Sequence, residues 1–582
     1  MTTGMRKRSF LLWLLIILLL VAPHIYRPVH TLESKHSSPA CYNNQSCFGN
    51  SLHYTSQSGF RLNIHETINI TGNDSFNSSN GVVRGSGTEA DPYIIEGWYI
   101  DAEGGSYCIQ IKNTNAFFII RNCTLLNAIF GTRYQDVAGI VLSNVTNGTM
   151  DNLSLSNNRN GLILSSSSNC TISNTSITNN TQGIRVVSSA NNTILGNNFT
   201  NNTYGIFLNY ANNNRLLNNT ISNSTVSIYH SYSTSTTLSG NNLQGSGILF
   251  DGNNITTWNT HEIDTTNLVN GKPVYYYKNQ EGVSVPSDAV QVILANCTNM
   301  AIANIISSNA IRAVQLGFSQ YNTIVNITVS GQQDAIFLAS SENNIIENNT
   351  LLNNGNGTNL TSSHRNQIRN NTISSNSNYG IRLFLSDSNS IAGNRLFNNT
   401  ICGILLSASC ETFISNNSFC NNGILVEGNS LTYWNTHEID TSNYINNRSI
   451  YYYKNQNGVI VPSDAGQVIL ANCTNITVAN LNITNTTYCA IQIAFSNNNT
   501  IMNNTVSRQQ YAFYLIYSDY NMIMNNTASN NSYGIYLFWC NYTHLNFNNL
   551  FNNFNFSLYL SSSCNNTISS NNASRNFKYG IY

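Results

Sequence analysis

The feature that most constrains this chain is a repeat with a period of about 22 residues, which lies in the range typical of solenoid proteins. A small residue followed by an aliphatic residue returns at this spacing, first in Gly139-Ile140, Gly161-Leu162, Gly183-Ile184, Gly205-Ile206 and Ser227-Ile228. The residues that follow alternate between variable and aliphatic, as in Ile206-Phe207-Leu208, and this period of two predicts a half-buried β-strand. Two further apolar positions in each unit, such as Ile172 and Ile177, predict two more short strands.

One such unit cannot bury its own inner face, whereas stacked copies can bury a shared core. No unit contains an apolar pattern of helical length. The sequence therefore predicts an all-β, single-stranded parallel β-helix with about 22 residues and three short strands per turn, and about 4.8 Å between turns. We assign residues 1–22 to a targeting segment, 23–80 to an N-terminal segment and cap, and 81–582 to the β-helix.

Charged residues are scarce, and Asn replaces them. The 582 residues include 25 Lys+Arg and 25 Asp+Glu, so 9% are charged, where about 25% is usual. This composition leaves no basic surface for nucleic acid and excludes a long coiled coil, and the 41% apolar content argues against disorder. We expect the corner residues Asn349, Asn371, Asn504 and Asn526 to belong to hydrogen-bonded ladders and to tolerate left-handed backbone.

The N-terminus has the pattern of a secretory signal. Arg6-Lys7-Arg8 precedes an apolar run from Phe10 to Ala22, which is shorter than the roughly 20 residues that span a bilayer. No clear cleavage site follows, so a cleaved signal and a retained anchor both remain open. No second hydrophobic run exists, and we expect a secreted or cell-surface protein that meets the membrane only through this segment.

The chain has 13 cysteines, an odd number. Cys41 and Cys47 are close enough in sequence to form a local disulfide, and the others are expected to be small buried hydrophobes.

The phrase Tyr204-Gly205-Ile206-Phe207-Leu208, with the Asn-rich corners that follow it, resembles the right-handed parallel β-helix repeat family. The resemblance covers roughly residues 90 to 582 and is strongest to NosD-like proteins and to carbohydrate-binding and sugar-hydrolase repeat domains. The stretch from Gly85 to Trp98 is similar to the opening turns of archaeal surface proteins of this type. The resemblance implies a right-handed helix and an extracytoplasmic location, and it says little about function.

Two segments of the chain, 258–299 and 434–475, are copies of each other at a constant offset. Trp258-Asn259-Thr260-His261-Glu262-Ile263-Asp264 returns as Trp434-Asn435-Thr436-His437-Glu438-Ile439-Asp440. The offset is a whole number of repeat units, so the copies should occupy the same angular position. The simplest interpretation is a structural insert anchored by Trp258 and Trp434. The functional alternative treats His261, Glu262 and Asp264, with His437, Glu438 and Asp440, as catalytic candidates for acid–base chemistry.

Most of the repeats lack the carboxylates that an acid–base pair needs. Residues 152–250 contain no Asp or Glu, and residues 465–582 contain only Asp519. Enzymes that cleave polysaccharides need clustered carboxylates. A lyase or hydrolase would therefore have to use the block carboxylates or the acidic N-terminal stretch of Asp91, Glu96, Asp101 and Glu103. This makes a non-catalytic protein the first choice and an enzyme the alternative.

The NosD-like resemblance implies a second alternative, copper handling. Met522, Met524 and His544 are candidate ligands, because thioether and imidazole groups suit soft metals. Ile523 is a core position, so both methionines should point outward. No cofactor is otherwise expected.

Aromatic residues recur at the outward position between the two core aliphatics, at Phe207, Tyr229, Phe337, Tyr514 and Tyr536. Aromatic faces in a row suit sugar rings, and self-stacking that stabilises the turns is the alternative. We therefore expect an extracytoplasmic surface scaffold or adhesion protein whose partners are extracellular glycans or cell-surface components.

Overall fold

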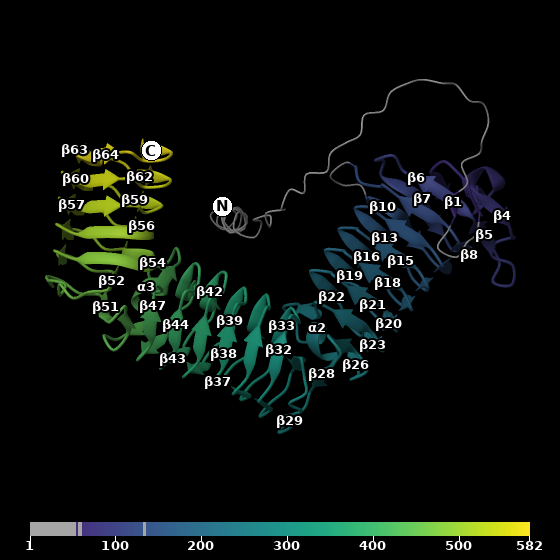
Figure 1. The fold of residues 1–582 in the computed structure, drawn as a ribbon, viewed down its shortest axis with the longest axis horizontal. Coiled ribbons are helices and arrows are strands. Elements are labelled where there is room, and N and C mark those ends of the chain that lie inside the picture. Colours follow the sequence, from purple (N-terminus) through teal and green to yellow (C-terminus); the bar gives the residue numbers. More distant parts are fainter. Residues whose placement is uncertain (1–53, 56–60, 132–135) are drawn as a thin grey trace, which may run out of the picture. The chain divides into compact units, whose positions relative to one another are not determined.

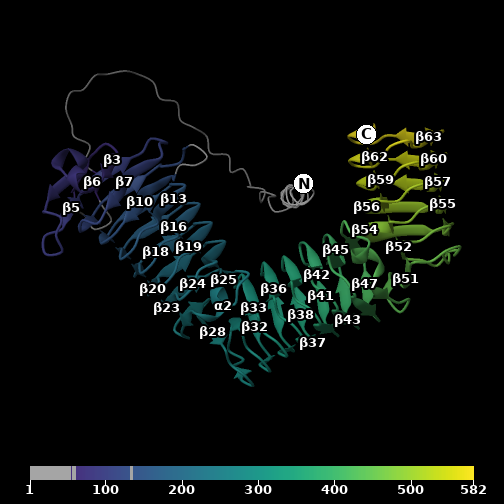
Figure 2. The same ribbon diagram turned by 180° about the vertical axis from the view of Figure 1, so that it is seen from behind.

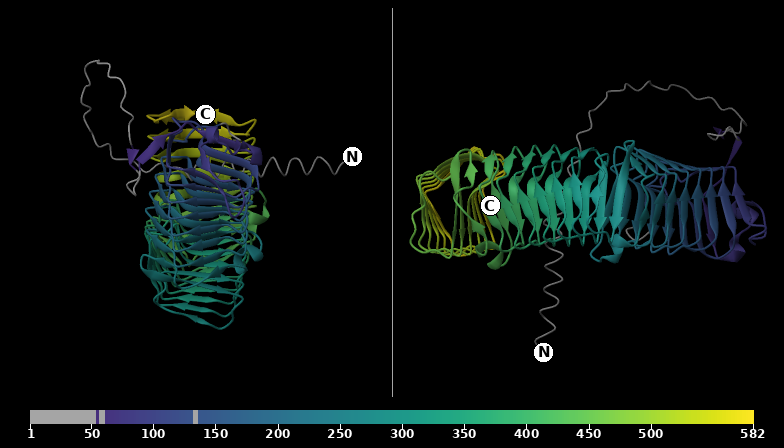
Figure 3. Two further views of the ribbon diagram at one scale, coloured as in Figure 1. Left: turned by 90° about the vertical axis from the view of Figure 1, so that its right-hand side faces the viewer. Right: turned by 90° about the horizontal axis from the view of Figure 1, so that it is seen from below.

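The computed structural model describes residues 54–55, 61–131 and 136–582, which form a parallel β-helix. Figures 1 and 2 show the strands of successive turns lying side by side, and Figure 3 shows the turns stacked one on the next. A typical turn contains β13 (Asn160–Ser165), β14 (Thr171–Ser173) and β15 (Ser176–Thr178). Each pairs in parallel with the corresponding strand of the next turn, as Ile172 does with Ile194. The all-β solenoid with three short strands per turn is confirmed.

The first strand of each turn is the longest, and within each of three parts of the chain these strands form a column. In the N-terminal part they are β7 (Tyr107–Thr114), β10 (Ala138–Val145), β13, β16 (Gln182–Val187), β19 (Tyr204–Asn209), β22 (Val226–Ser231) and β25 (Ile248–Asp251). In the middle they are β30 (Gln291–Ala295), β33 (Arg312–Gly317), β36 (Asp334–Ala339), β39 (Asn356–Thr361), β42 (Tyr379–Phe384), β45 (Cys402–Ser407) and β48 (Ile424–Glu427). In the C-terminal part they are β52 (Gln467–Ala471), β54 (Asn482–Ala494), β56 (Thr505–Ile516), β59 (Tyr533–Phe538), β62 (Phe556–Ser561) and β65 (Tyr579–Ile581).

Among the described residues, no helix is both long and apolar enough to cross a membrane. The N-terminal targeting segment and the Cys41–Cys47 pair lie outside the described residues. Of the eleven cysteines whose state is described, eight are buried, as expected for small hydrophobes, and Cys420 and Cys564 are exposed.

Adjacent asparagines have two different roles at each corner. Asn218 adopts the left-handed conformation with φ 53°, and glycine replaces it at the same corner of the neighbouring turns, as Gly240 with φ 68°. The next residue, Asn219, is fully buried. Its backbone N–H and its side-chain amide both donate to Oδ1 of Asn241, at 3.1 and 3.0 Å, and its amide also donates to the carbonyl of Ile194. These ladders satisfy the buried corner backbone, which explains the Asn content without any function.

The duplicated blocks divide the solenoid into three stacks: 61–269, 272–445 and 448–582. At the first block β27 (Leu268–Val269) turns back and pairs in antiparallel with β28 (Lys272–Lys278), which then begins a new parallel stack with β30. At the second block β50 (Tyr444–Ile445) and β51 (Arg448–Lys454) do the same before β52. The buried apolar residues correspondingly form three large clusters rather than one. We call each change of stack a joint.

A buried tryptophan anchors each joint, as the structural interpretation of the blocks predicted. The single-turn helices α2 (Thr256–Asn259) and α3 (Thr432–Asn435) hold Trp258 and Trp434, both fully buried. The indole of Trp258 donates to the carbonyl of Gly252 at 3.1 Å, and the hydroxyl of Tyr276 donates to the carbonyl of Trp258 at 2.5 Å. Trp434 and Tyr452 repeat both contacts at the second joint.

Glutamine side chains complete the strand that ends each column at a joint. At the first joint β25 is the last strand of its sheet. Gln291 accepts a hydrogen bond from the N–H of Ile248 at 3.0 Å and donates to its carbonyl at 2.8 Å. Gln315 accepts from the N–H of Phe250 at 3.2 Å and donates to the carbonyl of Ile248 at 2.7 Å. The two side-chain amides thus supply the hydrogen bonds that a neighbouring strand would have made.

The second joint repeats this arrangement. Gln467 bonds both backbone groups of Ile424, at 3.0 and 2.8 Å. Gln492 accepts from the N–H of Val426 at 3.1 Å and donates to the carbonyl of Ile424 at 2.7 Å. The repeated Gln-Val-Ile-Leu-Ala of β30 and β52 was the sequence signal for the first glutamine of each pair, and sequence reasoning did not use it.

Candidate functional site

The histidine of each duplicated block is buried and hydrogen-bonded to backbone groups. His261 is fully buried, its Nδ1 accepts the N–H of Thr236 at 3.2 Å, and its Nε2 is 3.1 Å from the carbonyl of Thr257. Burial lowers its pKa to about 4. In the second block His437 bonds Thr412 and Tyr433 in the same way, and burial lowers its pKa to about 4. Neither ring offers a free nitrogen to a substrate.

The block carboxylates lie on the opposite, exposed side, as expected for alternate positions. Glu262 pairs with Lys278 at 2.6 Å, and Asp264 accepts a hydrogen bond from Ser239 at 2.7 Å. In the second copy Glu438 pairs with Lys454 at 2.5 Å, and Asp440 accepts from the N–H of Ser442 at 3.0 Å. The structure therefore separates each histidine from its two carboxylates.

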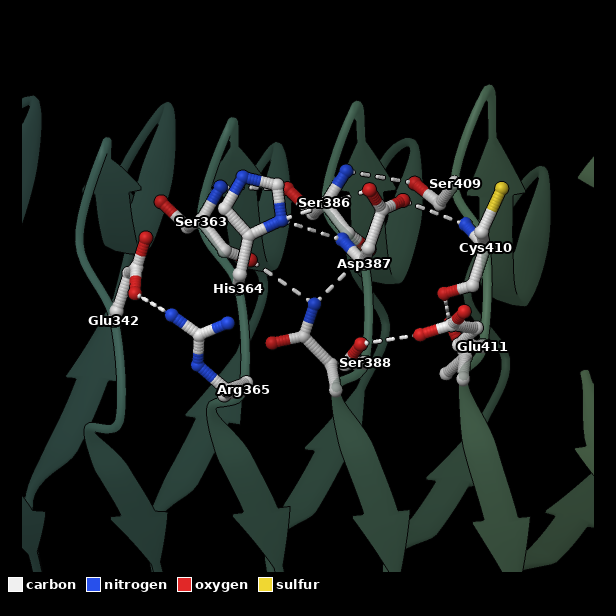
Figure 4. A network of polar contacts seen from close by, with 12 residues as sticks. Glu342, Ser363, His364, Arg365, Ser386, Asp387, Ser388, Ser409, Cys410 and Glu411 are labelled. Atoms are coloured by element: carbon white, nitrogen blue, oxygen red, sulfur yellow. Dashed lines mark hydrogen bonds and ion pairs between the residues drawn. The ribbon is translucent and has the colours of Figure 1, made fainter.

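A second polar group lies on one corner of the middle stack (Figure 4). His364 Nδ1 accepts the N–H of Asp387 at 3.0 Å, and Asp387 Oδ1 accepts the N–H of Cys410 at 2.7 Å. Arg365 pairs with Glu342, and Ser388 donates to Glu411 at 2.9 Å. Each of these side chains holds the backbone or a side chain of the neighbouring turn. The same contact recurs at Asp519, whose Oδ1 accepts the N–H of Asn541 at 2.7 Å, so this network has a structural explanation.

The outward residues of the first strands form two rows that start after each joint. In the middle stack the first row runs through Arg312, Asp334, Asn356, Tyr379 and Cys402, and the second through Gln315, Phe337, Asn359, Arg382 and Leu405. In the C-terminal stack the same two rows run through Cys489, Tyr511, Tyr533, Phe556 and Tyr579, and through Gln492, Tyr514, Tyr536, Tyr559 and Tyr582. Identical register positions therefore have mixed polar and apolar side chains in the middle stack and almost only aromatic side chains in the C-terminal stack.

In the middle stack the rows contain a buried ion pair. Arg312 Nε donates to Asp334 Oδ2 at 2.9 Å, and the guanidinium lies 3.5 Å from the ring centroid of Phe337. Asn356 and Asn359 donate to the other carboxylate oxygen at 2.7 and 3.0 Å. The sequence placed Phe337 among the outward aromatic residues, but it is only 8% exposed, because Arg312 covers its ring.

In the C-terminal stack the rows form an aromatic ladder, which we define as Tyr511, Tyr514, Tyr533, Tyr536, Phe556, Tyr559, Tyr579 and Tyr582. Rings within a row stack, with centroids 4.9 Å apart for Tyr536 and Tyr559 and 5.3 Å for Tyr559 and Tyr582. Rings of the two rows meet edge to face, as Tyr511 and Tyr536 do at 5.2 Å. Two candidates from the sequence, Tyr514 and Tyr536, belong to this ladder.

The remaining two candidates lie before the first joint. Phe207 and Tyr229 have ring centroids 5.2 Å apart, and the hydroxyl of Tyr229 donates to Asp251 at 3.0 Å. The five aromatic candidates are thus divided among three stacks and do not form one continuous row.

The candidate metal ligands share one outward surface. Met522 pairs in register with His544, and Met524 lies opposite Met502, which sequence reasoning missed. Met522 is 39% exposed and Ile523 is buried, so the outward orientation of Met522 is confirmed. Within the part of the chain that the structure describes, no three His, Cys, Asp or Glu residues gather as a metal-binding group.

Two family models match the chain, and their boundaries follow the joints. The model described as periplasmic copper-binding protein (NosD) matches residues 251–458, which contain both joints and the middle stack. The model described as right handed beta helix region matches residues 95–243 and 466–582, which fall in the outer stacks. The expected right-handed family is therefore confirmed.

A comparison with curated proteins finds no match. Solved structures that are similar to the chain include an alginate lyase from Paenibacillus sp. str. FPU-7, at 13% identity and TM-score 0.26, over 51% of this chain and 97% of that one. A mutant tailspike of E. coli bacteriophage HK620 in complex with pentasaccharide matches at 14% identity and TM-score 0.24, over 77% and 70%. The A-module of an Azotobacter vinelandii mannuronan C-5 epimerase matches at 12% identity and TM-score 0.22, over 66% of this chain and 92% of that one. Fold does not determine function, so those substrates belong to those proteins.

Proposed function

Because the chain belongs to the right-handed parallel β-helix repeat family, we propose that it is an extracytoplasmic, non-catalytic scaffold that binds carbohydrate along the aromatic ladder. The observation that supports this most is the ladder itself: eight aromatic side chains in two adjacent rows on one outward face. The register-equivalent rows of the middle stack lack it.

The ladder offers hydroxyl groups and ring edges rather than open ring faces. The rings within a row cover one another, so a sugar cannot stack flat on most of them. The hydroxyls of Tyr514, Tyr536 and Tyr559 make no hydrogen bond to the described residues, and these side chains are only half-buried. A row of free phenol groups between apolar edges suits a ligand with many hydroxyls and little charge.

Calorimetry with a neutral β-1,4-linked glucose hexamer tests the proposal. Tyr536→Phe removes one hydroxyl and keeps the stacked ring, so binding is expected to weaken about fivefold, the equivalent of one hydrogen bond. Tyr536→Ala, which also removes apolar contact, should weaken binding further. Tyr542→Phe is the matched control, because Tyr542 stacks with Tyr520 at 4.9 Å on another corner of the same turns. Equal affinities of wild type and Tyr536→Phe would contradict the role of the ladder hydroxyls.

Copper handling is a second candidate, since the NosD description names copper and the register brings Met502, Met522, Met524 and His544 onto one face. Thioether and imidazole donors fit Cu(I), and these four side chains would hold it. They lie outside residues 251–458, where the one methionine, Met300, is buried. Once the accessible thiols, Cys420 and Cys564 included, are alkylated, silver(I) titration in anaerobic buffer is expected to show one site that Met522→Leu weakens and Met300→Leu does not. Equal binding by both variants would reject this site.

A further inference from the structure

The column of first strands before each joint closes with a strand that ends in an outward-facing acidic residue. Asp251 ends β25 and Glu427 ends β48, and the same offset separates them as separates the duplicated blocks, so they occupy the same register position. Asp251 pairs in register with Ser231, and Glu427 with Ser407. The two acids differ in what surrounds them.

At the first joint the acid is satisfied by the protein. The hydroxyl of Tyr229 donates to Asp251 at 3.0 Å. The guanidinium of Arg312 lies next to it, since Nη1 donates to the carbonyl of Phe250 at 3.2 Å. Asp251 therefore has a hydrogen-bond donor and a nearby positive charge.

At the second joint both groups are absent from the equivalent positions. Leu405 replaces Tyr229, and Cys489 replaces Arg312. Arg382 is the nearest cation that affects Glu427, but it donates to Asn359 at 3.0 Å and lies over the ring of Phe384. Within the described residues, the Glu427 carboxylate accepts no hydrogen bond and forms no ion pair.

Tyrosine side chains pack against the outward face of the strand that ends in Glu427. Tyr379 and Tyr488 pack together against the apolar side chains at the joint, and Tyr488 meets Tyr511 edge to face at 5.4 Å. Tyr511 in turn contacts Tyr514 at 5.1 Å, at the start of the aromatic ladder. Burial, and after it the charge of Glu427, raises the pKa of Tyr488 and Tyr514. No described residue receives a hydrogen bond from these hydroxyls.

We propose that Glu427 and the neighbouring tyrosines Tyr379 and Tyr488 form a sugar subsite at the joint end of the aromatic ladder, and that Glu427 determines its charge selectivity. The carboxylate accepts hydrogen bonds from hydroxyl or ammonium groups of a sugar unit, while the rings contact its apolar edges. A sugar carboxylate is excluded by repulsion between like charges. This inference rests on the proposed function, because the same bound chain would continue along the ladder.

Three β-1,4-linked hexamers of different charge test the subsite: glucose, glucosamine and mannuronate. Wild-type protein is expected to bind the neutral and amine-bearing hexamers at least about tenfold more tightly than the uronate. Glu427→Gln keeps the side-chain shape and removes the charge. It should weaken glucosamine binding by about 10- to 100-fold and strengthen mannuronate binding, so the selectivity is lost. Asp251→Asn, at the register-equivalent position, should change none of the three affinities.

The outcomes separate the inference from the proposed function. If wild type binds glucose hexamer, and Glu427→Gln leaves the ranking of the three hexamers unchanged, the subsite is wrong while the ladder still stands. If wild type prefers the mannuronate hexamer, Glu427 does not select charge and the inference is again wrong. If wild type binds none of the hexamers, both the ladder and the subsite are rejected for these sugars.

Discussion

The two joints have the same interior and different exteriors. Each has a buried tryptophan, a tyrosine that donates to its carbonyl, a buried histidine and two glutamines that complete the last strand. After the first joint the outward rows begin with Arg312 and Asp334, and after the second they begin with Cys489 and Tyr511. The two copies of the block thus share the buried residues that connect two stacks, whereas the outward side chains beside them differ between the copies. Function is therefore expected where the copies differ.

The largest expected effect tests whether the interiors are equivalent. Trp258→Ala and Trp434→Ala each remove a fully buried indole, which should cost about 4 kcal/mol of local stability. Because a solenoid does not unfold as one unit, the measurement is hydrogen exchange of the strands beside each joint. Similar losses at both joints are expected; a loss at one joint alone would show that the copies do not have the same structural role.

The next effect should occur at the first joint alone. Arg312→Met leaves Asp334 buried without its cation and should cost about 3 kcal/mol, measured by exchange in β33 and β36. The double variant Arg312→Met/Asp334→Asn should recover most of the loss, since both charges are then removed and the introduced amide oxygen still accepts from Asn356 and Asn359. Cys489→Ala, at the equivalent position of the second joint, is expected to have little effect. A loss for Cys489→Ala as large as that for Arg312→Met would contradict the distinction between the joints.

The glutamine effect should be smaller and present at both joints. Gln467→Leu removes the hydrogen bonds that the Gln467 amide makes to the N–H and carbonyl of Ile424, which should cost about 2 kcal/mol of local stability. Gln291→Leu removes the equivalent bonds at Ile248. Exchange of the Ile424 and Ile248 amides reports the change directly. If these amides stay as protected as before, the glutamines do not replace a strand.

The last effect concerns pH and should again distinguish the joints. His261 and His437 are buried with pKa values of about 4, so both joints should lose stability as the pH falls from about 6.5 towards 4, because the unfolded chain takes up protons that the folded chain does not. The first joint also contains His230, whose two ring nitrogens are buried without partners and whose pKa is lowered by burial and by His261.

The equivalent of His230 at the second joint is Leu406. His230→Leu should therefore stabilise the first joint by about 1 kcal/mol at neutral pH and remove its additional loss in acid. Exchange at pH 7 and pH 5 in β22 and β25 checks this. Unchanged acid sensitivity in the variant would show that His230 does not cause it.

The solenoid was predictable from the sequence because its periodicity is local. Alternation at Ile206 and Leu208 fixes which side chains enter the core, and the regular spacing of the repeat fixes the register between turns. The Asn ladders followed from the same spacing. The division into three stacks did not, because it depends on a hairpin between β27 and β28 whose apolar pattern is that of any other strand pair.

The surface was harder to predict, because an outward position says nothing about what covers it. Phe337 and Tyr536 have the same sequence context, yet Arg312 covers the first and a neighbouring tyrosine stacks on the second. His261 looked reactive next to Glu262, and only the fold shows that backbone groups occupy both ring nitrogens. Nothing in the sequence singled out Glu427. Its carboxylate differs from that of Asp251 because Asp251 has a hydrogen-bond donor, Tyr229, that Glu427 lacks.

Hydrogen exchange of the whole protein with and without the glucose hexamer tests the central claim most directly. The ligand is expected to slow exchange in β54, β56, β59 and β62, which hold the ladder and its start, and to leave β33, β36, β39 and β42 unchanged. Protection confined to the middle stack, or no protection in any strand at saturating hexamer, would contradict the claim that the aromatic ladder is the binding surface.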